Sequence, residues 1–543
     1  MSRVFIDFQT QKRTPYPSSY QLRHPTPPPV LHWSTAVLFF ADLCNSTSVY
    51  DWSLLARPGF MTGRIRLNST PEAPHLTRAL GVRDVALFMV TAGCSVQWAT
   101  TAAAAGPSSL LVWVFGGLTM FLPLSVCVVF LSSRYPDEGG LYVWSKHAFG
   151  PFAGFMTGWT YWTSNLPFLT SLLYFAAGSA LFWSGQRDTA ASASPSYFIC
   201  FSIAALGVAV ALNVRGLASA KWLNSAGAIA RWLETILLVG LGLAIWRRFG
   251  TATPITRQTI VPGFRLADMV FWATIAFAWT GPEAASFMGG EIRDPRRAVP
   301  RAFAIAAPMI AAIYILGTGS VLVSIPPEQA NALYGLMEAI SSDAARLNLL
   351  WLIPVAAAFV VLDRLGSVGV WLGAVARIPF VAGLDHHLPR SFARLHPRHG
   401  SPTVAIWTQA VIIAAFAFLG QAGTSVRGAY TVVVEMMVVA TMLPFVPLFG
   451  AAIKLSADAP VPGEVRIPGG RPTVVVMALI GLATTLGAIA LAFVPPADEE
   501  RPAIAVLKVA GMTTTLLLAG AAVYFAGSAR ARRLERRAGG PPQ

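Results

Sequence analysis

Apolar residues form long runs from Asp84 onward, with short polar stretches between the runs. A helix rises about 1.5 Å per residue, so roughly 20 apolar residues cross the ~30 Å hydrocarbon core of a bilayer. The runs that approach this length lie at 84–106, 109–131, 152–182, 197–213, 224–246, 268–289, 302–324, 349–374, 403–420, 428–451, 473–494 and 503–526. The pattern predicts an all-α polytopic membrane protein with twelve transmembrane helices.

Residues 1–82 follow a different pattern. They contain the proline-rich stretches TPYPSSY and HPTPPPV, which cannot form a helix. The apolar patch at 30–44 is too short and too interrupted to span a bilayer. Met61 opens a stretch typical of a short cytoplasmic tail before a first span. We expect 1–82 to be a disordered N-terminal tail, with translation starting at Met61.

The charge of the chain agrees with a membrane protein. Hydrophobic residues make up 55% and charged residues only 12%, whereas soluble domains average about 45–50% and about 25%. The net charge of +15 lies mostly in short loops between the apolar runs, which excludes nucleic-acid binding as its explanation. Apart from the outer loop 247–265, the bias places both termini, including the basic tail 527–543, in the cytoplasm. We expect a multi-pass protein of the cell membrane.

Residues typical of metal sites and active sites show no useful pattern. The four cysteines have no paired spacing, and the eight histidines fall in tails or loops. Neither a disulfide framework nor a metal site is therefore indicated. The nucleotide-binding pattern G-x-x-x-x-G-K-[ST] does not occur, and no catalytic cluster lies in the apolar runs. We expect no cofactor and no enzymatic activity.

The stretch 279–301, WTGPEAASFMGGEIRDPRRAVPR, interrupts an apolar run with Gly281, Pro282 and an acid, Glu283. Proline removes a backbone donor, so a Gly-Pro pair breaks a helix. Unsatisfied backbone groups in lipid cost several kcal/mol each, and such breaks survive only where they line a protein-buried or watery cavity. We expect the break to border such a cavity, and the cluster Asp294-Pro295-Arg296-Arg297 to cap the same helix at the cytoplasmic face.

Three stretches, 135–162, 279–301 and 377–405, together resemble the amino acid–polyamine–organocation (APC) permease superfamily, in particular its bacterial amino acid permeases. The G-x-E pattern followed by D-P-R-R-x-V-P-R is typical of that family around its sixth helix. The resemblance covers about 84–526. It implies two inverted five-helix repeats, formed by spans 1–5 and 6–10, plus two C-terminal helices.

Inverted repeats place broken helices at corresponding positions, around a central solute site. The first span should therefore also be interrupted, and VTAGCSVQW at 90–98 carries small residues at its centre. The half-helix that follows offers free amides and a positive dipole end to a carboxylate. The predicted substrate-binding residues are Gly93, Cys94 and Ser95, together with the backbone of Ala278, Trp279, Thr280 and Gly281.

Aromatic and acidic residues near the second break suggest further roles. Phe277 falls where some exchangers of the family place a gating aromatic, although packing is the alternative. By resemblance, Glu283 takes part in proton coupling; a structural role near the second half-helix is the alternative. Trp159, Tyr161 and Trp162 in the third span are expected to be packing or wall residues, and no further role is assigned to them.

Two charges, Asp363 and Arg364, lie near the middle of the eighth span. The resemblance implies that this span lines the ion or proton site. We predict that they take part in proton or ion coupling. Arg364 has Glu283 or Glu435 as a potential partner, and it would replace the cation that sodium-coupled relatives bind.

A second pair of charges, Arg231 and Glu234, lies in the fifth span. Residues three apart share a helix face. We therefore expect an internal ion pair between these two side chains.

The resemblance implies a secondary active transporter that moves amino acids across the bilayer by alternating access, as a proton symporter or an amino acid exchanger. The acidic centre leaves a polyamine or organic cation transporter as the alternative, and a nutrient sensor with a transporter fold as another. A channel is disfavoured because the breaks are localised. The expected partners are an amino acid or amine and the lipid bilayer; the sequence leaves the oligomeric state open.

Overall fold

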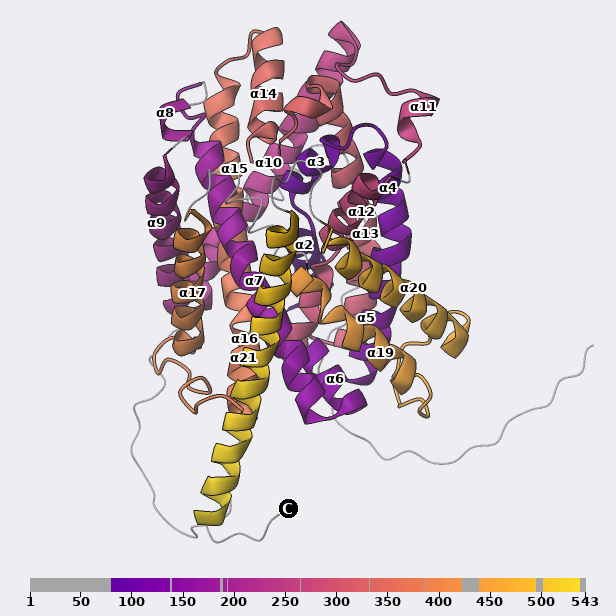
Figure 1. Cartoon of the computed structure of the whole chain (residues 1–543), viewed down its shortest axis with the longest axis vertical. Coiled ribbons are helices and arrows are strands. Elements are labelled where there is room, and N and C mark those ends of the chain that lie inside the picture. Colours follow the sequence, from indigo (N-terminus) through magenta and orange to yellow (C-terminus); the bar gives the residue numbers. More distant parts are fainter. Residues whose placement is uncertain are drawn as a thin grey trace, which may run out of the picture. The chain divides into compact units, whose positions relative to one another are not determined.

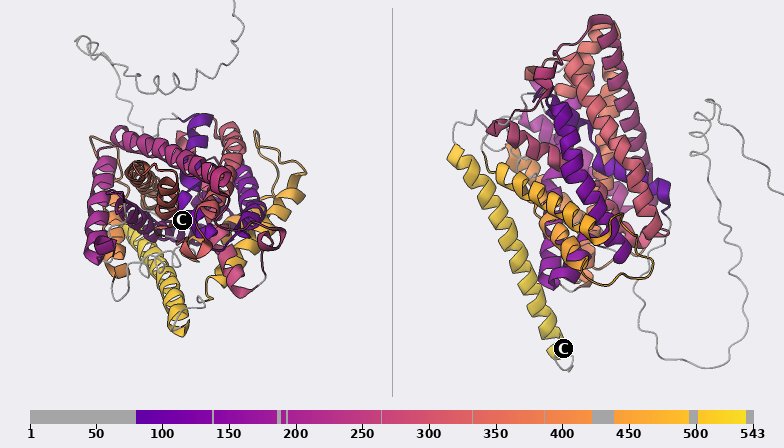
Figure 2. Two further views of the ribbon diagram at one scale, coloured as in Figure 1. Left: turned by 90° about the horizontal axis from the view of Figure 1, so that it is seen from above. Right: turned by 90° about the vertical axis from the view of Figure 1, so that its right-hand side faces the viewer.

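The computed structural model describes residues 80–537, except 137–138, 186–188, 193, 264, 332, 386, 422–438 and 495–501. Figure 1 and Figure 2 show the described residues as helices joined by short connections. Within these residues there is no strand, and the one isolated β-bridge joins Leu80 to Ile292. The predicted all-α class is therefore confirmed. Almost all of the predicted tail 1–82 lies outside the described residues.

The helices of the first half begin at Val82. In chain order they are α2 (Val82–Gly93), α3 (Val96–Ala103), α4 (Ser109–Gly116), the π-helix η1 (Gly117–Phe121), α5 (Leu122–Arg134), α6 (Leu141–Phe149), α7 (Pro151–Ala180), α8 (Thr189–Ser192), α9 (Pro195–Val214) and α10 (Leu217–Phe249).

The second half continues with α11 (Arg257–Ile260), α12 (Leu266–Ala278), the 3-10 helix η2 (Pro282–Glu291), α13 (Pro295–Ser324), the short 3-10 helix η3 (Pro327–Gln329), α14 (Gly335–Arg346), α15 (Leu352–Val375), α16 (Arg377–Leu384), α17 (Thr403–Gln421), α19 (Phe445–Leu455), α20 (Gly470–Leu491) and α21 (Pro502–Arg537). Figure 1 shows α21, in yellow, running along α7. The indole Nε1 of Trp159 in α7 donates a hydrogen bond to the carbonyl of Leu516 in α21, at 2.9 Å.

Seven helices of the described part are long and apolar enough to cross a membrane, by length and composition. They are Val82–Ala103, Ser109–Arg134, Pro195–Val214, Trp222–Phe249, Pro295–Ser324, Leu352–Ala382 and Gly470–Leu491. The chain is therefore a multi-pass membrane protein. The count of twelve spans and the inverted repeats remain predictions.

The charged cluster after the second break does not cap the sixth helix, so that prediction is wrong. Asp294 adopts a left-handed conformation (φ 91°) and Pro295 opens α13, the next helix. Proline suits a first helical position because its missing N–H would have no partner there. The Arg296 Nε donates a hydrogen bond to the carbonyl of Ser133 at the end of α5, at 3.1 Å. The cluster therefore fastens the start of α13 to α5.

The two other stretches that the sequence singled out contact each other. α6 belongs to the first and α16 to the second, and Asp385 follows α16. The carboxylate of Asp385 accepts hydrogen bonds from the Tyr142 hydroxyl and from Lys146 Nζ, the latter at 2.8 Å. Burial, together with this carboxylate, raises the pKa of Tyr142. The contact joins two connections that are distant in sequence.

α10 and α15 cross at a pair of glycines. A Cβ atom added to Gly227 would lie 2.6 Å from the Cα of Gly366, far inside van der Waals contact. Such a short backbone separation brings the side chains one turn away, Arg231 and Asp363, within reach of each other. The crossing therefore positions the charges described below.

We predict that Gly227→Ala lowers the melting temperature of the purified protein, because α10 and α15 must separate; overpacking costs about 1–3 kcal/mol. The matched control is Gly240→Ala in the same helix, where an added Cβ has no neighbour within 4 Å. The control should leave the melting temperature unchanged or raise it. Equal behaviour of the two variants in a thermal melt would contradict the tight crossing.

Candidate functional site

The first span is broken where the sequence predicted. α2 ends at Gly93, and Cys94 and Ser95 are extended, with φ of −130° and −143°, before α3 begins at Val96. Ser95 is the N-cap of α3, but its side chain does not cap the helix. The first amides of α3 therefore have no side-chain partner at the break.

The second break is also present. α12 ends at Ala278, Gly281 has φ 120°, and the chain resumes as η2 at Pro282. Only glycine adopts such a conformation without strain. The Gly-Pro pair therefore interrupts this helix in the way that the sequence indicated.

The two breaks lie against each other, backbone to backbone. A Cβ added to Gly281 would lie 2.6 Å from the carbonyl oxygen of Ala92, and one added to Gly93 would lie 2.4 Å from Cγ of Pro282. Both glycines are therefore required by the close approach, and at Gly281 by the positive φ as well. Two half-helix ends from distant parts of the chain meet at one point.

Tyr314 in α13 holds both half-helix ends. Its hydroxyl oxygen lies 3.0 Å from the carbonyl oxygen of Gly93 and 2.8 Å from that of Ala278. A buried carbonyl without a partner is costly in lipid, and the single O–H of Tyr314 is shared between these two carbonyls. Tyr314 could not be identified from sequence, where it is one aromatic in an apolar run.

Glu283 stabilises the second break. The amide of Gly281 donates a hydrogen bond to its Oε2 at 2.6 Å, and the hydroxyl of Tyr161 in α7 donates to its Oε1 at 3.0 Å. The side chain is fully buried. Tyr161, expected to be a packing or wall residue, therefore also contacts the acid at the break. The coupling role of Glu283 stays a prediction.

A cavity of about 40 Å³ lies at the junction of the two breaks. This volume has room for roughly three water molecules. Of the predicted site residues, those that line the cavity are Gly93, Cys94, Ser95, Phe277, Ala278, Thr280, Gly281 and Glu283. Residues that the sequence analysis did not assign to the site also line it: Ala92, Trp98, Tyr161, Asn165, Phe168, Tyr314, Trp371 and Thr441.

Trp279 lies between the lining residues but does not line the cavity. Its indole Nε1 donates a hydrogen bond to the carbonyl of Trp113, at 3.1 Å, and its ring packs on that tryptophan and on Phe121. The ring also fills the space beside Gly116 and Gly117. Its side chain therefore anchors α12 to the second span, and only its backbone remains near the site.

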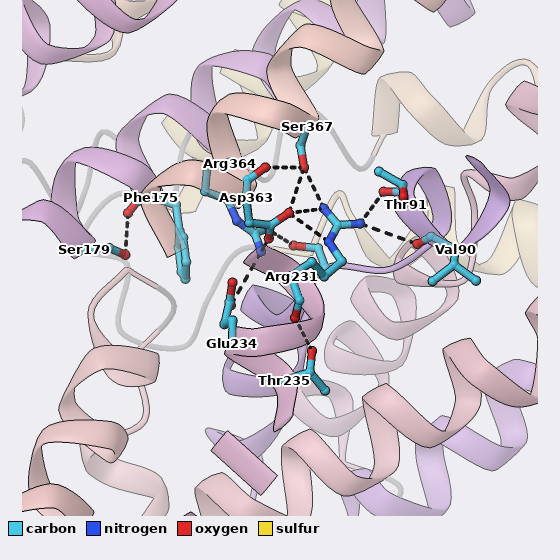
Figure 3. Close-up of polar contacts among 11 residues, drawn as sticks. Val90, Thr91, Phe175, Ser179, Arg231, Glu234, Thr235, Asp363, Arg364 and Ser367 are labelled. Atoms are coloured by element: carbon cyan, nitrogen blue, oxygen red, sulfur yellow. Dashed lines mark hydrogen bonds and ion pairs between the residues drawn. The ribbon is translucent and has the colours of Figure 1, made fainter. Parts of the chain in front are cut away.

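Four buried charges lie behind the first break and form what we call the four-charge cluster: Arg231 and Glu234 from α10, and Asp363 and Arg364 from α15 (Figure 3). Arg231 Nη2 lies 2.8 Å from Asp363 Oδ1, and Arg364 Nη2 pairs with Asp363 Oδ2. Arg364 Nη2 also lies 3.7 Å from Glu234 Oε1. Each arginine is thus paired with an acid.

These pairings differ from those expected. No direct Arg231–Glu234 ion pair forms in the described structure; each of these residues pairs with a residue of α15 instead. Arg364 pairs with Asp363 and Glu234 rather than with Glu283. Glu435, the other expected partner, lies outside the described residues. The partners come from different helices, so spacing along one helix did not reveal them.

The four-charge cluster is fastened to the first break. Arg231 Nη1 donates to the carbonyl of Thr91 in the last turn of α2, and Arg231 Nη2 donates to Ser367 Oγ at 2.6 Å. Arg364 Nη1 donates to Ser95 Oγ, at the start of α3. Both ends of the interrupted span therefore receive a positive charge. In the described part of the chain, no group of three or more His, Cys, Asp or Glu residues is placed to hold a metal ion.

Comparisons with known proteins agree with this geometry. A family model described as "Amino acid permease" matches residues 80–518. An uncharacterised transporter of Legionella pneumophila is 26% identical over 428 residues, covering 78% of this chain and 91% of that protein. A probable agmatine/putrescine antiporter, AguD of Lactococcus lactis, is 24% identical over 377 residues, covering 68% and 78%. The crystal structure of MhsT in complex with L-phenylalanine has a TM-score of 0.53 at 14% identity, covering 75% of this chain and 98% of that one.

We predict that Tyr161→Phe and Glu283→Gln lower the melting temperature by less in combination than their separate effects sum to. Tyr161→Phe removes the hydroxyl that donates to Glu283, and Glu283→Gln replaces the charged acceptor with a neutral amide, so both change the same contact. Contacting residues show coupling energies of about 0.5–3 kcal/mol. The control is Tyr174→Phe, which removes the hydroxyl that donates to the carbonyl of Ala417, elsewhere on α7. That change should add to Glu283→Gln. Strict additivity of Tyr161→Phe with Glu283→Gln would contradict the contact.

Proposed function

The chain belongs to the amino acid permease family of the APC superfamily, and we propose that it is a secondary active transporter that moves amino acids by alternating access. The observation that carries this proposal is the junction of two broken spans around one cavity. Discontinuous helices that meet at membrane depth are typical of solute sites in such transporters. The proposal includes an inner or plasma membrane location with both termini in the cytoplasm.

The start of α3 is suited to the carboxylate of an amino acid. Its first amides have no side-chain cap, and a helix N-terminus carries a partial positive charge. Arg364 adds a full positive charge through its hydrogen bond to Ser95. We assign the carboxylate to Ser95 and to the amides that follow it, with Gly93 and Cys94 beneath.

The C-terminal ends of α2 and α12 are suited to the amine. Their last carbonyls carry a partial negative charge, which favours a cation. Tyr314 keeps the carbonyls of Gly93 and Ala278 in place. The backbone from Ala278 to Gly281 would complete the amine site.

The wall around the rest of the solute is mostly aromatic. Trp98 packs edge-to-face on Phe277, with ring centroids 5.2 Å apart, and Phe168 packs on Trp371 at 5.5 Å. Because the cavity is small, a bound amino acid requires wall side chains to move. Phe277 is our candidate for the gate.

The same wall favours an amino acid over a polyamine. Among the described lining residues the one acid is Glu283, and hydrogen bonds from Tyr161 and Gly281 already engage both of its oxygens. A polyamine has no carboxylate for α3 and needs acids for each ammonium group. The name of the Lactococcus lactis relative keeps the polyamine carrier as the second candidate.

The position of Arg231 argues against sodium as the driving ion. Carbonyl oxygens at a helix end together with a hydroxyl form a cation site, and Arg231 already binds the Thr91 carbonyl and Ser367 there. A fixed guanidinium removes the need for sodium. The sequence suggests this role for Arg364; the contacts above assign it to Arg231 instead, and we propose proton symport or amino acid exchange as the coupling.

The test is counterflow in liposomes that contain the purified protein and are preloaded with one unlabelled solute. The panel comprises L-leucine, L-phenylalanine, L-arginine, agmatine and putrescine, with and without sodium and with and without a pH gradient; empty liposomes are the control. We expect a preloaded amino acid to accelerate uptake of the same labelled amino acid, unchanged when choline replaces sodium.

Each other outcome has a defined meaning. Counterflow of putrescine or agmatine without that of any amino acid would replace the proposal with the polyamine carrier. Binding of an amino acid without counterflow would replace it with a sensor. Counterflow that requires sodium would contradict the role of Arg231.

A further inference from the structure

Glu234 differs from the other buried acids at the centre of the molecule. It is fully buried, and neither carboxylate oxygen receives a hydrogen bond. Both oxygens of Glu283 receive one, and Asp363 receives them from two arginines and from Ser367. A buried carboxylate without a donor is costly, so Glu234 is the acid that gains most from a proton.

Glu234 has a neighbouring partner both as a carboxylate and as a protonated carboxyl group. As a carboxylate it faces Arg364 Nη2 at 3.7 Å, a longer separation than either ion pair of Asp363. Its carboxyl group and that of Asp363 both face the same nitrogen, Arg364 Nη2, so the two carboxyl groups are neighbours. Two carboxyl groups share a hydrogen bond only when one of them carries a proton. Glu234 can therefore exchange a long ion pair for a short hydrogen bond when it is protonated.

Within the part of the chain that the structure describes, the charged groups that surround Glu234 all belong to the four-charge cluster, so these groups decide whether Glu234 is protonated. The charges that act on Glu234 are those of Arg364, Asp363 and Arg231. Of the other elements around the cluster, α13 contributes the Tyr314 hydroxyl and the first break contributes the Cys94 thiol. The helices α9 and α14 also pack on α10, but within the described residues no ion pair or hydrogen bond joins Glu234 to a side chain of either helix.

The charge of the four-charge cluster links the proton to the substrate. With both acids ionised, two positive and two negative charges cancel; with Glu234 protonated, the cluster carries one positive charge. Arg364 joins the cluster to Ser95, where the proposed function places the substrate carboxylate. A net positive cluster attracts a carboxylate, and by linkage a bound carboxylate favours the proton.

We propose that Glu234 is the proton-binding residue of the transport cycle. A proton from the water on one side binds its carboxylate, the hydroxyl formed donates to Asp363, and Arg364 is released from Glu234 toward Ser95 and the substrate. The proton leaves to the other side when the substrate leaves. This inference rests on the proposed function and competes with the coupling role that the sequence assigns to Glu283.

The test uses full-length protein in liposomes that enclose a pH-sensitive dye, with L-leucine or the panel amino acid of fastest counterflow as the probe. Proton entry that depends on the amino acid is measured together with counterflow, for wild type and for Glu234→Gln, Glu283→Gln and Thr235→Val. Thr235 is the neighbour of Glu234 on α10 and is uncharged, so it controls for the loss of a buried polar group. Gel filtration and thermal melts report whether each variant folds.

We expect Glu234→Gln to keep counterflow and to lose substrate-dependent proton entry by about tenfold or more, because the amide mimics the protonated acid permanently. Its counterflow should not vary between acidic and mildly alkaline pH. Thr235→Val should keep proton entry. Glu283→Gln changes the cavity lining, so its transport can slow, but the ratio of proton entry to amino acid entry should stay that of the wild type. If Glu234→Gln does not fold, Glu234→Asp should retain proton entry with a shifted pH dependence, since a carboxyl group remains.

Two results would overturn the inference while leaving the proposed function intact: counterflow with wild-type proton entry in Glu234→Gln, or a fall in the ratio of proton entry to amino acid entry in Glu283→Gln alone. Wild-type counterflow without any proton entry would also overturn it and would identify an exchanger. Failure of counterflow for every amino acid would instead contradict the proposed function itself.

Discussion

Backbone groups inside a membrane must have partners, and this constraint determines how the two broken spans are built. Each break exposes carbonyls at one half-helix end and amides at the other. The protein supplies a specific side chain for several of them: Tyr314 for the carbonyls of Gly93 and Ala278, Arg231 for that of Thr91, and Glu283 for the amide of Gly281. The first amides of α3 have no side-chain cap. These amides without a side-chain partner are the backbone donors that a carboxylate can bind.

The buried charges of the four-charge cluster must also have partners, and these partners are charges of opposite sign. Four charges in a low-dielectric interior are tolerated because each cation is paired with an acid, and the close crossing at Gly227 and Gly366 brings the two helices near enough for these pairs. Arg231 and Arg364 then reach the two halves of the interrupted first span. A change in the charge of Glu234 would therefore alter the electrostatic potential at the proposed substrate site without any contact between Glu234 and the substrate.

The two breaks could be predicted from sequence because their residues constrain the backbone conformation. The pair Gly281-Pro282 directly predicts a helix break. The small residues Gly93 to Ser95 indicate one only because the resemblance to inverted repeats implies a second broken helix. The pairings could not be predicted. Arg231 and Asp363 lie 132 residues apart, and only the packing of helices brings them together. Tyr314 likewise has the same appearance in sequence as any aromatic that packs.

Side-chain direction also limited the prediction. Trp279 lies within the predicted binding stretch, but its ring packs on Trp113 and Phe121, because one step along a helix turns the side chain by about 100°. The sequence predicts a packing or wall residue at Tyr161, and it does not reveal that the Tyr161 hydroxyl also reaches Glu283. Residue type and position in the span are the same evidence in both cases. The two residues differ in the direction of their side chains, which depends on how each helix is rotated about its own axis. This rotation cannot be read from the sequence.

The most direct test of the central claim is an experimental structure of the protein with the amino acid that counterflow identifies. The account predicts the amino acid at the junction of the two breaks, with its carboxylate within hydrogen-bonding distance of the first amides of α3 and its side chain against Phe277 and Trp98. An amino acid bound elsewhere, with the start of α3 unoccupied, would contradict it.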